Sequence, residues 1–79
     1  MAGAKAFVLI EVNVGKAREV AGAISKLKGS GVDSVYTVTG PYDIIAIVEG
    51  ETLNEIGDLV TSKIHPISGI SRTVTCLTL

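Results

Sequence analysis

The sequence predicts a small α+β domain of the ferredoxin-like class, with the element order β-α-β-β-α-β. Three observations lead to this class. The chain has 79 residues, of which 47% are apolar, which suits one domain with a single core. Two stretches carry apolar residues at helical spacing, and each lies between stretches rich in β-branched residues. Right-handed crossovers then place both helices on one face of a four-stranded antiparallel sheet.

A strand followed by a helix opens the pattern. Residues 6–14 are rich in β-branched residues and predict a strand that ends before Gly15. Apolar residues then recur at spacings of three and four, as on one face of an amphipathic helix. These residues are Ala17, Val20, Ala21, Ile24 and Leu27. Gly29 predicts the end of this helix, because glycine is common just after the last turn.

A β-hairpin follows, with strands predicted at roughly residues 32–39 and 43–50. Gly40 can adopt a positive φ at no steric cost, and Pro41 fixes its own φ and restricts its neighbour. The corner is therefore longer than a two-residue turn. It also carries the hydroxyl of Thr39, the ring of Tyr42 and the carboxylate of Asp43. These are more polar groups than a turn needs.

The second helix and the last strand complete the pattern. Thr52 and Glu55 have the spacing of a capping box at a helix N-terminus. Apolar residues at helical spacing follow, and Pro66 and Gly69 end the helix. These apolar residues are Leu53, Ile56, Val60 and Ile64. The last strand is predicted from about residue 70 to residue 79.

Both sides of the predicted strands are apolar, which indicates a dimer. The two helices can cover only one side, whereas a half-exposed antiparallel sheet normally alternates apolar and polar residues. An uncovered apolar patch is rare in soluble monomers, and small domains without disulfides are often stabilised by oligomerisation. We therefore predict that the uncovered face packs against a second subunit. The residues expected in this interface are Phe7, Leu9, Ile45 and Ile47.

Charge and hydropathy exclude several classes of partner. The net charge is −1, and the seven Lys and Arg residues are scattered rather than gathered on the basic face that nucleic acids require. No apolar run reaches the roughly 18 residues of a membrane span. Residues 1–5 lack the long apolar region of a signal peptide. We expect a cytoplasmic protein with no membrane partner and no direct nucleic-acid partner.

No metal, cofactor or catalytic site stands out. Cys76 is the only cysteine, which excludes a metallochaperone Cys-x-x-Cys pair, and its apolar strand predicts a buried thiol. His65 is the only histidine and has no second ligand at a suitable spacing. RNA-binding RRM domains share the topology but stack bases on exposed aromatic residues, and here the sheet offers Phe7 and little else. We predict no enzyme activity, no metal and no cofactor.

Residues 35–44, Val-Tyr-Thr-Val-Thr-Gly-Pro-Tyr-Asp-Ile, and residues 69–75, Gly-Ile-Ser-Arg-Thr-Val-Thr, carry a family resemblance. With the less specific residues 15–20, they resemble the effector-binding domain of the Lrp/AsnC (feast/famine) transcriptional regulators, also called the regulator-of-amino-acid-metabolism domain. The resemblance covers essentially the whole chain, so residues 1–79 are expected to form one such domain. Full-length regulators place a helix-turn-helix domain before it, whereas here only residues 1–5 precede the first strand. The sequence thus resembles the stand-alone form.

The resemblance implies an amino-acid-binding and oligomerisation module of transcriptional regulation. In the family, two sheets pack face to face in a dimeric αβ-barrel-like assembly, and dimers form rings, here expected to be octamers or decamers. Full-length Lrp/AsnC regulators are implied as further partners. Amino acids bind in clefts between dimers, where the family's Gly-x-Tyr-Asp pattern falls on Gly40, Tyr42 and Asp43. Residues near this pattern and in the last strand complete the expected ligand site, namely Thr39 and Pro41 together with Thr73 and Thr75 of the same or of another subunit.

The expected ligand chemistry is simple, and each residue also has a structural alternative. Asp43 can accept a hydrogen bond from the ammonium of an amino acid, hydroxyls and exposed amides can donate to its carboxylate, and the ring of Tyr42 can form a wall. Alternatively, Asp43 only bonds amides of the turn and Tyr42 anchors an interface. The threonines of the last strand also suit β structure as such.

Two other functions stay open. One is an enzyme on the same fold, such as a small dimeric αβ-barrel monooxygenase or isomerase, because fold alone does not fix function. Its acid-base group would be His65, but this residue lies beside Pro66 and apart from the hairpin in sequence. The other is a purely structural partner that assembles with full-length regulators.

Overall fold

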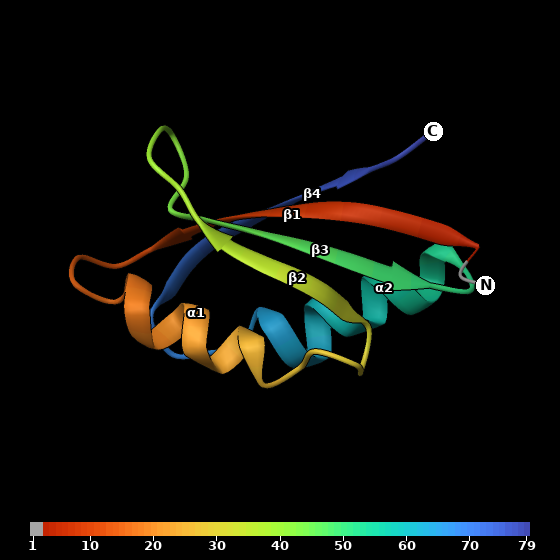
Figure 1. Ribbon diagram of the computed structural model, residues 1–79, viewed down its shortest axis with the longest axis horizontal. Coiled ribbons are helices and arrows are strands. Elements are labelled where there is room, and N and C mark those ends of the chain that lie inside the picture. Colours follow the sequence, from red (N-terminus) through yellow and green to blue (C-terminus); the bar gives the residue numbers. More distant parts are fainter. Residues whose placement is uncertain (1–2) are drawn as a thin grey trace.

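The computed structural model describes residues 3–79 and has the predicted order of elements (Figure 1). The strands are β1 (Ala4–Val12), β2 (Val32–Thr37), β3 (Ile44–Gly50) and β4 (Ile70–Leu77). The helices are α1 (Ala17–Ser25) and α2 (Leu53–Leu59), and α2 continues into the short π-helix η1 (Val60–Ile64). The expectation for residues 1–5 lies partly outside the described residues.

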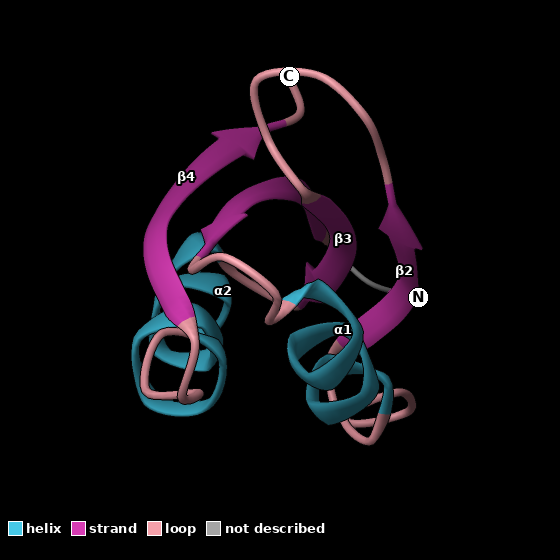
Figure 2. Ribbon diagram, turned by 90° about the vertical axis from the view of Figure 1, so that its left-hand side faces the viewer, coloured by secondary structure: helices cyan, strands magenta, loops and turns pink. Residues whose placement is uncertain are grey.

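One antiparallel sheet with the strand order β2-β3-β1-β4 forms the upper layer of the molecule. Both helices lie below it, so the other face of the sheet is open (Figure 2). The predicted ferredoxin-like fold is therefore confirmed. The hairpin between β2 and β3 rises above the open face (Figure 1).

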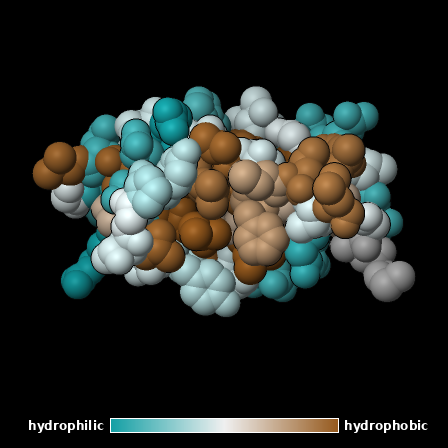
Figure 3. All heavy atoms as spheres, turned by 90° about the horizontal axis from the view of Figure 1, so that it is seen from above, coloured by the Kyte–Doolittle hydropathy of each residue, from teal (hydrophilic) through white to brown (hydrophobic). Residues whose placement is uncertain are grey.

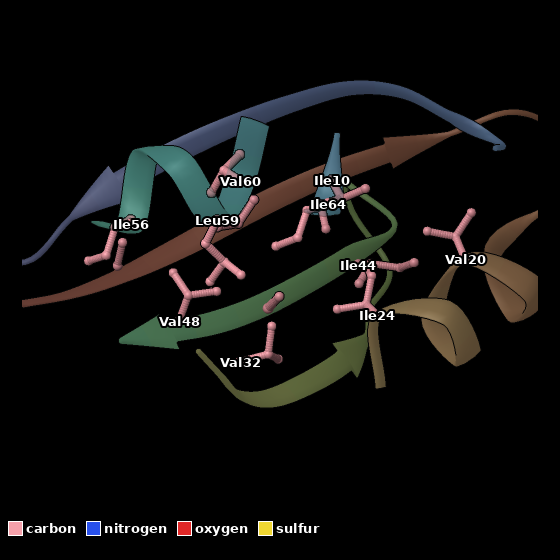
Figure 4. Packing of buried hydrophobic residues seen from close by; sticks show 13 residues of the cluster. Ile10, Val20, Ile24, Val32, Ile44, Val48, Ile56, Leu59, Val60 and Ile64 are labelled. Carbon is pink, nitrogen blue, oxygen red and sulfur yellow. The ribbon is translucent and has the colours of Figure 1, made fainter. Parts of the chain in front are cut away.

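A hydrophobic core fills the space between the sheet and the helices (Figure 4). Alternate residues of β1 and β3 point into it and are fully buried. The helices contribute Val20, Ile24, Ile56 and Ile64 from the predicted apolar stripes. The sheet contributes Ala6, Val8, Ile10, Ile44, Ala46 and Val48. Since no buried side chain among residues 3–79 is polar or charged, the candidate functional groups lie outside the core.

The first strand begins and ends two residues earlier than predicted. It starts at Ala4 because Ala4 still pairs with Gly50 of β3. It ends at Val12 because the amide of Lys16 donates to the carbonyl of Asn13 at 3.0 Å and closes a turn. Val14 lies in this turn and is fully exposed, so its β-branched side chain does not extend the strand.

The ends of the two helices differ from the prediction in detail. The amide of Leu27 donates to the carbonyl of Ile24 at 2.9 Å, which tightens the end of α1 before Gly29 is reached. At α2 the capping box is confirmed, because Thr52 Oγ1 accepts a hydrogen bond from the Glu55 amide at 3.2 Å. The Glu55 carboxylate reaches one residue further back than expected and accepts from the Glu51 amide at 3.1 Å.

Candidate functional site

The hairpin corner, defined here as residues 38–43, stands above the open face of the sheet (Figure 1). The Val38 amide donates to the carbonyl of Asp43 at 2.9 Å and closes the corner. Gly40 has a φ of +140°, which side-chain-bearing residues rarely adopt, and nothing lies within 4 Å of the position of a Cβ atom there. Glycine is thus required by backbone conformation, and Thr39, Gly40 and Pro41 are all exposed to solvent.

Asp43 fixes the hairpin corner to β1. Its amide donates to the carbonyl of Ile10 at 2.9 Å, and its Oδ2 accepts from the Val12 amide at 2.9 Å. The structural alternative for Asp43 is therefore present, although the bonded amide belongs to β1 rather than to the turn. The other carboxylate oxygen, Oδ1, has no hydrogen-bond partner within residues 3–79. One carboxylate oxygen therefore joins the corner to β1, and the other is an unused acceptor within the described residues.

Tyr42 fixes the corner to β4 through a residue that the sequence analysis did not assign to the site. Nη2 of Arg72 donates to the hydroxyl of Tyr42 at 2.9 Å, and its Cζ lies 5.7 Å from the centre of the ring. This hydrogen bond, followed by the electrostatic influence of Tyr42 and Glu11, raises the pKa of Arg72 above its ordinary value. The available signal was the place of Arg72 within residues 69–75, which carry the family resemblance.

A β-bulge in β4 directs Arg72 toward the hairpin. Val12 of β1 pairs with Ile70, and Glu11 pairs with Arg72, so Ser71 is an extra residue without a partner. Ile70 therefore shares the core side with Val12, whereas Arg72 shares the open face with Glu11. Ser71 Oγ donates to the carbonyl of Glu11 at 3.2 Å. Bulges commonly redirect a side chain in this way beside functional sites.

Thr73 and Thr75 lie on the opposite side of the sheet from the hairpin corner. They pair with Ile10 and Val8, which face the helices. Thr75 lines a groove of about 250 Å³ between α2 and β4, together with Leu53, Ile56, Gly57, Val60, Thr61 and Leu77. One chain therefore does not bring the two predicted halves of the ligand site together. A cleft that contains both halves needs side chains from a second subunit.

The open face carries all four residues predicted for the dimer interface. Phe7 pairs with Ile47 and Leu9 pairs with Ile45, so these side chains gather on one side of the two central strands. Figure 3 shows hydrophobic residues over the middle of this face. Phe7 is 38% exposed and the neighbouring Tyr36 is 55% exposed, values that leave apolar surface for a partner.

Cys76 corrects one prediction, because its thiol is exposed rather than buried. The register of β4 pairs Cys76 with Phe7 and so places it on the open face, not under the helices. The apolar character of its strand therefore reflects the uncovered face and not the core.

A second hollow, of about 560 Å³, lies at the end of the sheet remote from the hairpin corner. It is lined by a glycine-containing loop at residues 29–33 and by the carboxylates of Glu49, Glu51 and Glu55. It contains none of the predicted ligand-site residues. Within residues 3–79 no group of three or more His, Cys, Asp or Glu side chains is arranged to hold a metal ion, and His65 is exposed at the end of η1.

The helices of residues 3–79 are too short and too polar to cross a membrane. A family model described as the Lrp/AsnC ligand binding domain matches residues 5–79. The chain belongs to the Lrp/AsnC ligand-binding domain family. An uncharacterized HTH-type transcriptional regulator of Pyrococcus furiosus is 37% identical over 76 residues, which are 92% of this chain and 49% of that protein. The Lrp/AsnC domain thus spans about half the length of the curated relatives it matches.

Solved structures share the fold of this chain. The crystal structure of the protein TTHA0845 from Thermus thermophilus superposes with a TM-score of 0.88 at 38% identity, covering 96% of this chain and 92% of that one. A transcriptional regulator of Neisseria meningitidis, solved as a complex with L-Met, has a TM-score of 0.82 at 23% identity and shares the fold. It is covered over 51% of its length and this chain over 99%.

Proposed function

We propose that this Lrp/AsnC domain binds an amino acid and forms oligomers in transcriptional regulation, without enzyme activity of its own. The observation that carries the proposal is the hairpin corner, which stands above an open apolar face (Figure 1). It presents three exposed residues beside the Asp43 carboxylate, of which only Oδ2 accepts a hydrogen bond within residues 3–79. Family membership supports the regulatory role. The L-Met complex of the Neisseria meningitidis regulator supports an amino acid as the ligand class.

The corner supplies the groups that an α-amino acid needs. Oδ1 of Asp43 accepts from the ammonium, and the amides near Gly40 and the hydroxyl of Thr39 donate to the carboxylate. The ring of Tyr42, held by Arg72, forms a wall for the side chain. Because Thr73 and Thr75 face away from this corner, they join the site only as residues of a neighbouring subunit.

Dimerisation covers the open face in this proposal, and dimers then assemble into a ring of eight or ten subunits. Phe7, Leu9, Ile45 and Ile47 form the centre of the dimer interface, because they are apolar, adjacent and not covered by a helix. Full-length Lrp/AsnC regulators in the cytoplasm are proposed as further partners of this ligand-binding domain, which matches the family over residues 5–79.

Native mass spectrometry of the purified protein, alone and with a pool of the common amino acids, tests the function. A ring of dimers that gains the mass of one amino acid per subunit is the expected result, and the added mass identifies the ligand. A ring that gains no mass would remove the sensing role and leave a structural partner of full-length regulators. A monomer at micromolar concentration would contradict the role of the open face.

A further inference from the structure

We infer that Arg72 is a positioning residue, which clamps the hairpin corner across the open face and so holds the ligand site in one conformation. This inference deepens the proposed function and rests on it for the role of the corner. The clamp itself is a property of the free protein.

Two attachments on different strands define the position of the corner. Asp43 attaches it to β1 through the Val12 amide at 2.9 Å. Tyr42 attaches it to β4 through Nη2 of Arg72, also at 2.9 Å. Since the strand order is β3-β1-β4, the second attachment crosses over β1 at the level of Glu11. A corner held at two points on different strands cannot pivot about either one.

Arg72 has no competing ion pair within residues 3–79. Its side chain is exposed and forms no ion pair within residues 3–79, so Tyr42 is its hydrogen-bond partner there. Its guanidinium is charged at neutral pH, and a charged donor forms a stronger hydrogen bond than a neutral one. The Ser71 bulge is what brings Arg72 to the open face while Ile70 stays against the core. The exposed side chain of Arg72, its charge and the bulge in β4 all favour the hydrogen bond to Tyr42.

Loss of the clamp should loosen the corner without unfolding the domain. Gly40 permits many backbone conformations, and Thr39 to Pro41 have no packing that would restrict them. A ligand that binds a mobile corner must order it first, which lowers affinity. We therefore expect faster amide exchange in the free protein and weaker amino-acid binding.

Hydrogen-deuterium exchange by mass spectrometry on the free, assembled protein tests the clamp directly. The variants are Arg72→Gln, Tyr42→Phe and their combination, and the matched control is Arg18→Gln, which removes the same charge from an exposed position on α1. Each single variant should speed exchange of the Val38 and Asp43 amides, which are the hydrogen-bonded amides of the corner, about five-fold, the size expected for one lost hydrogen bond. The double variant should add little to either single one, because both remove the same bond.

The outcomes separate the clamp from the proposed function. Unchanged exchange in the single variants, or fully additive effects in the double variant, would overturn the clamp whatever the ligand result. Loss of oligomers in Arg72→Gln but not in Tyr42→Phe would also overturn it, because Arg72 would then act as an interface residue. Absence of any bound amino acid with the exchange pattern intact would instead overturn the proposed function alone. Once a ligand is known, Arg72→Gln should raise its Kd about five-fold, Arg72→Lys should restore part of the loss, and Arg18→Gln should leave it unchanged.

Discussion

Asp43 joins the hairpin corner to the sheet through both its backbone and its side chain. The sequence predicted the corner and its polar residues, because glycine, proline and aspartate constrain a turn locally. It did not predict the hydrogen bond from Arg72 to Tyr42. The direction of the Arg72 side chain depends on the extra residue Ser71, and this bulge arises in the pairing of two strands that are distant in sequence. Local conformational preferences were readable at single residues, whereas long-range register was not.

Two variants of Asp43 separate its structural from its ligand-binding role. Asp43→Ala removes the acceptor of the Val12 amide and should lower the free energy of unfolding by about 1 kcal/mol. Asp43→Asn keeps an oxygen acceptor and should cost less, but it removes the negative charge that an ammonium group needs. Urea unfolding gives the first quantity and native mass spectrometry the second. Full amino-acid binding by Asp43→Asn would show that the carboxylate serves the fold only.

The clamp should not respond to pH in the ordinary range. The folded-state pKa of Arg72 is raised, so its stabilising effect is complete below the unfolded pKa and is lost only as pH rises through the higher folded value. Both pKa values lie far above neutral pH. The ratio of exchange rates between Arg72→Gln and the unaltered protein should therefore stay constant from about pH 6 to pH 9 after correction for intrinsic exchange. A ratio that falls toward one within this range would show that another group controls the corner.

At the scale of elements, the order of helices and strands was predicted from the sequence, but several predicted ends differ from those in the structure. The strand β1 was placed two residues too late, because Val14 has the composition of a strand but lies in a turn closed by Asn13 and Lys16. The end of α1 was placed at Gly29, whereas hydrogen bonds tighten the chain from Leu27 onward. Hydrogen bonds between neighbouring backbone groups decide such ends, and composition does not report them.

Two glycines in different elements should respond oppositely to alanine. Gly69, which leads into β4, has a φ of +102°, and an added Cβ would lie 3.0 Å from Cγ2 of Val20 and 3.1 Å from Cβ of Lys16. Gly69→Ala should therefore lower the free energy of unfolding by about 2 kcal/mol. Gly22 lies in α1 with open space around it, so Gly22→Ala should raise that free energy by about 0.5–1 kcal/mol. Urea unfolding measures both, and equal effects would contradict the assigned backbone strain.

At the scale of the whole molecule, the spacing of apolar residues predicted the fold, and apolar residues on both sides of the strands predicted an open apolar face. Neither pattern predicted that the two halves of the expected ligand site lie on opposite faces. Thr73 and Thr75 follow the helix side because of their pairing with Ile10 and Val8, and the hairpin corner lies above the other side. A site shared between subunits is not encoded by any spacing within one sequence.

A charge on the open face should break the assembly. Ile45→Lys places an ammonium group between Leu9 and Tyr36 at the centre of the proposed dimer interface. A buried unpaired charge costs several kcal/mol, so this variant should sediment as a monomer at micromolar concentration. Ser62→Lys on the exposed side of η1 is the matched control and should keep the oligomer. A dimer that survives Ile45→Lys would mean that subunits meet through another surface.

The reactivity of the Cys76 thiol on the open face can report whether this face is covered by another subunit. Cys76 is accessible in one chain and lies beside Phe7, the most exposed of the four proposed interface residues. Since Phe7 and Cys76 are paired neighbours on the same face, the proposed subunit over Phe7 would also shield this sulfur from solvent. The rate at which a thiol reagent modifies Cys76, measured over a dilution series, would therefore report the fraction of subunits that pair through this face. Because Cys76 is the only cysteine of the sequence, no label has to be engineered into the chain.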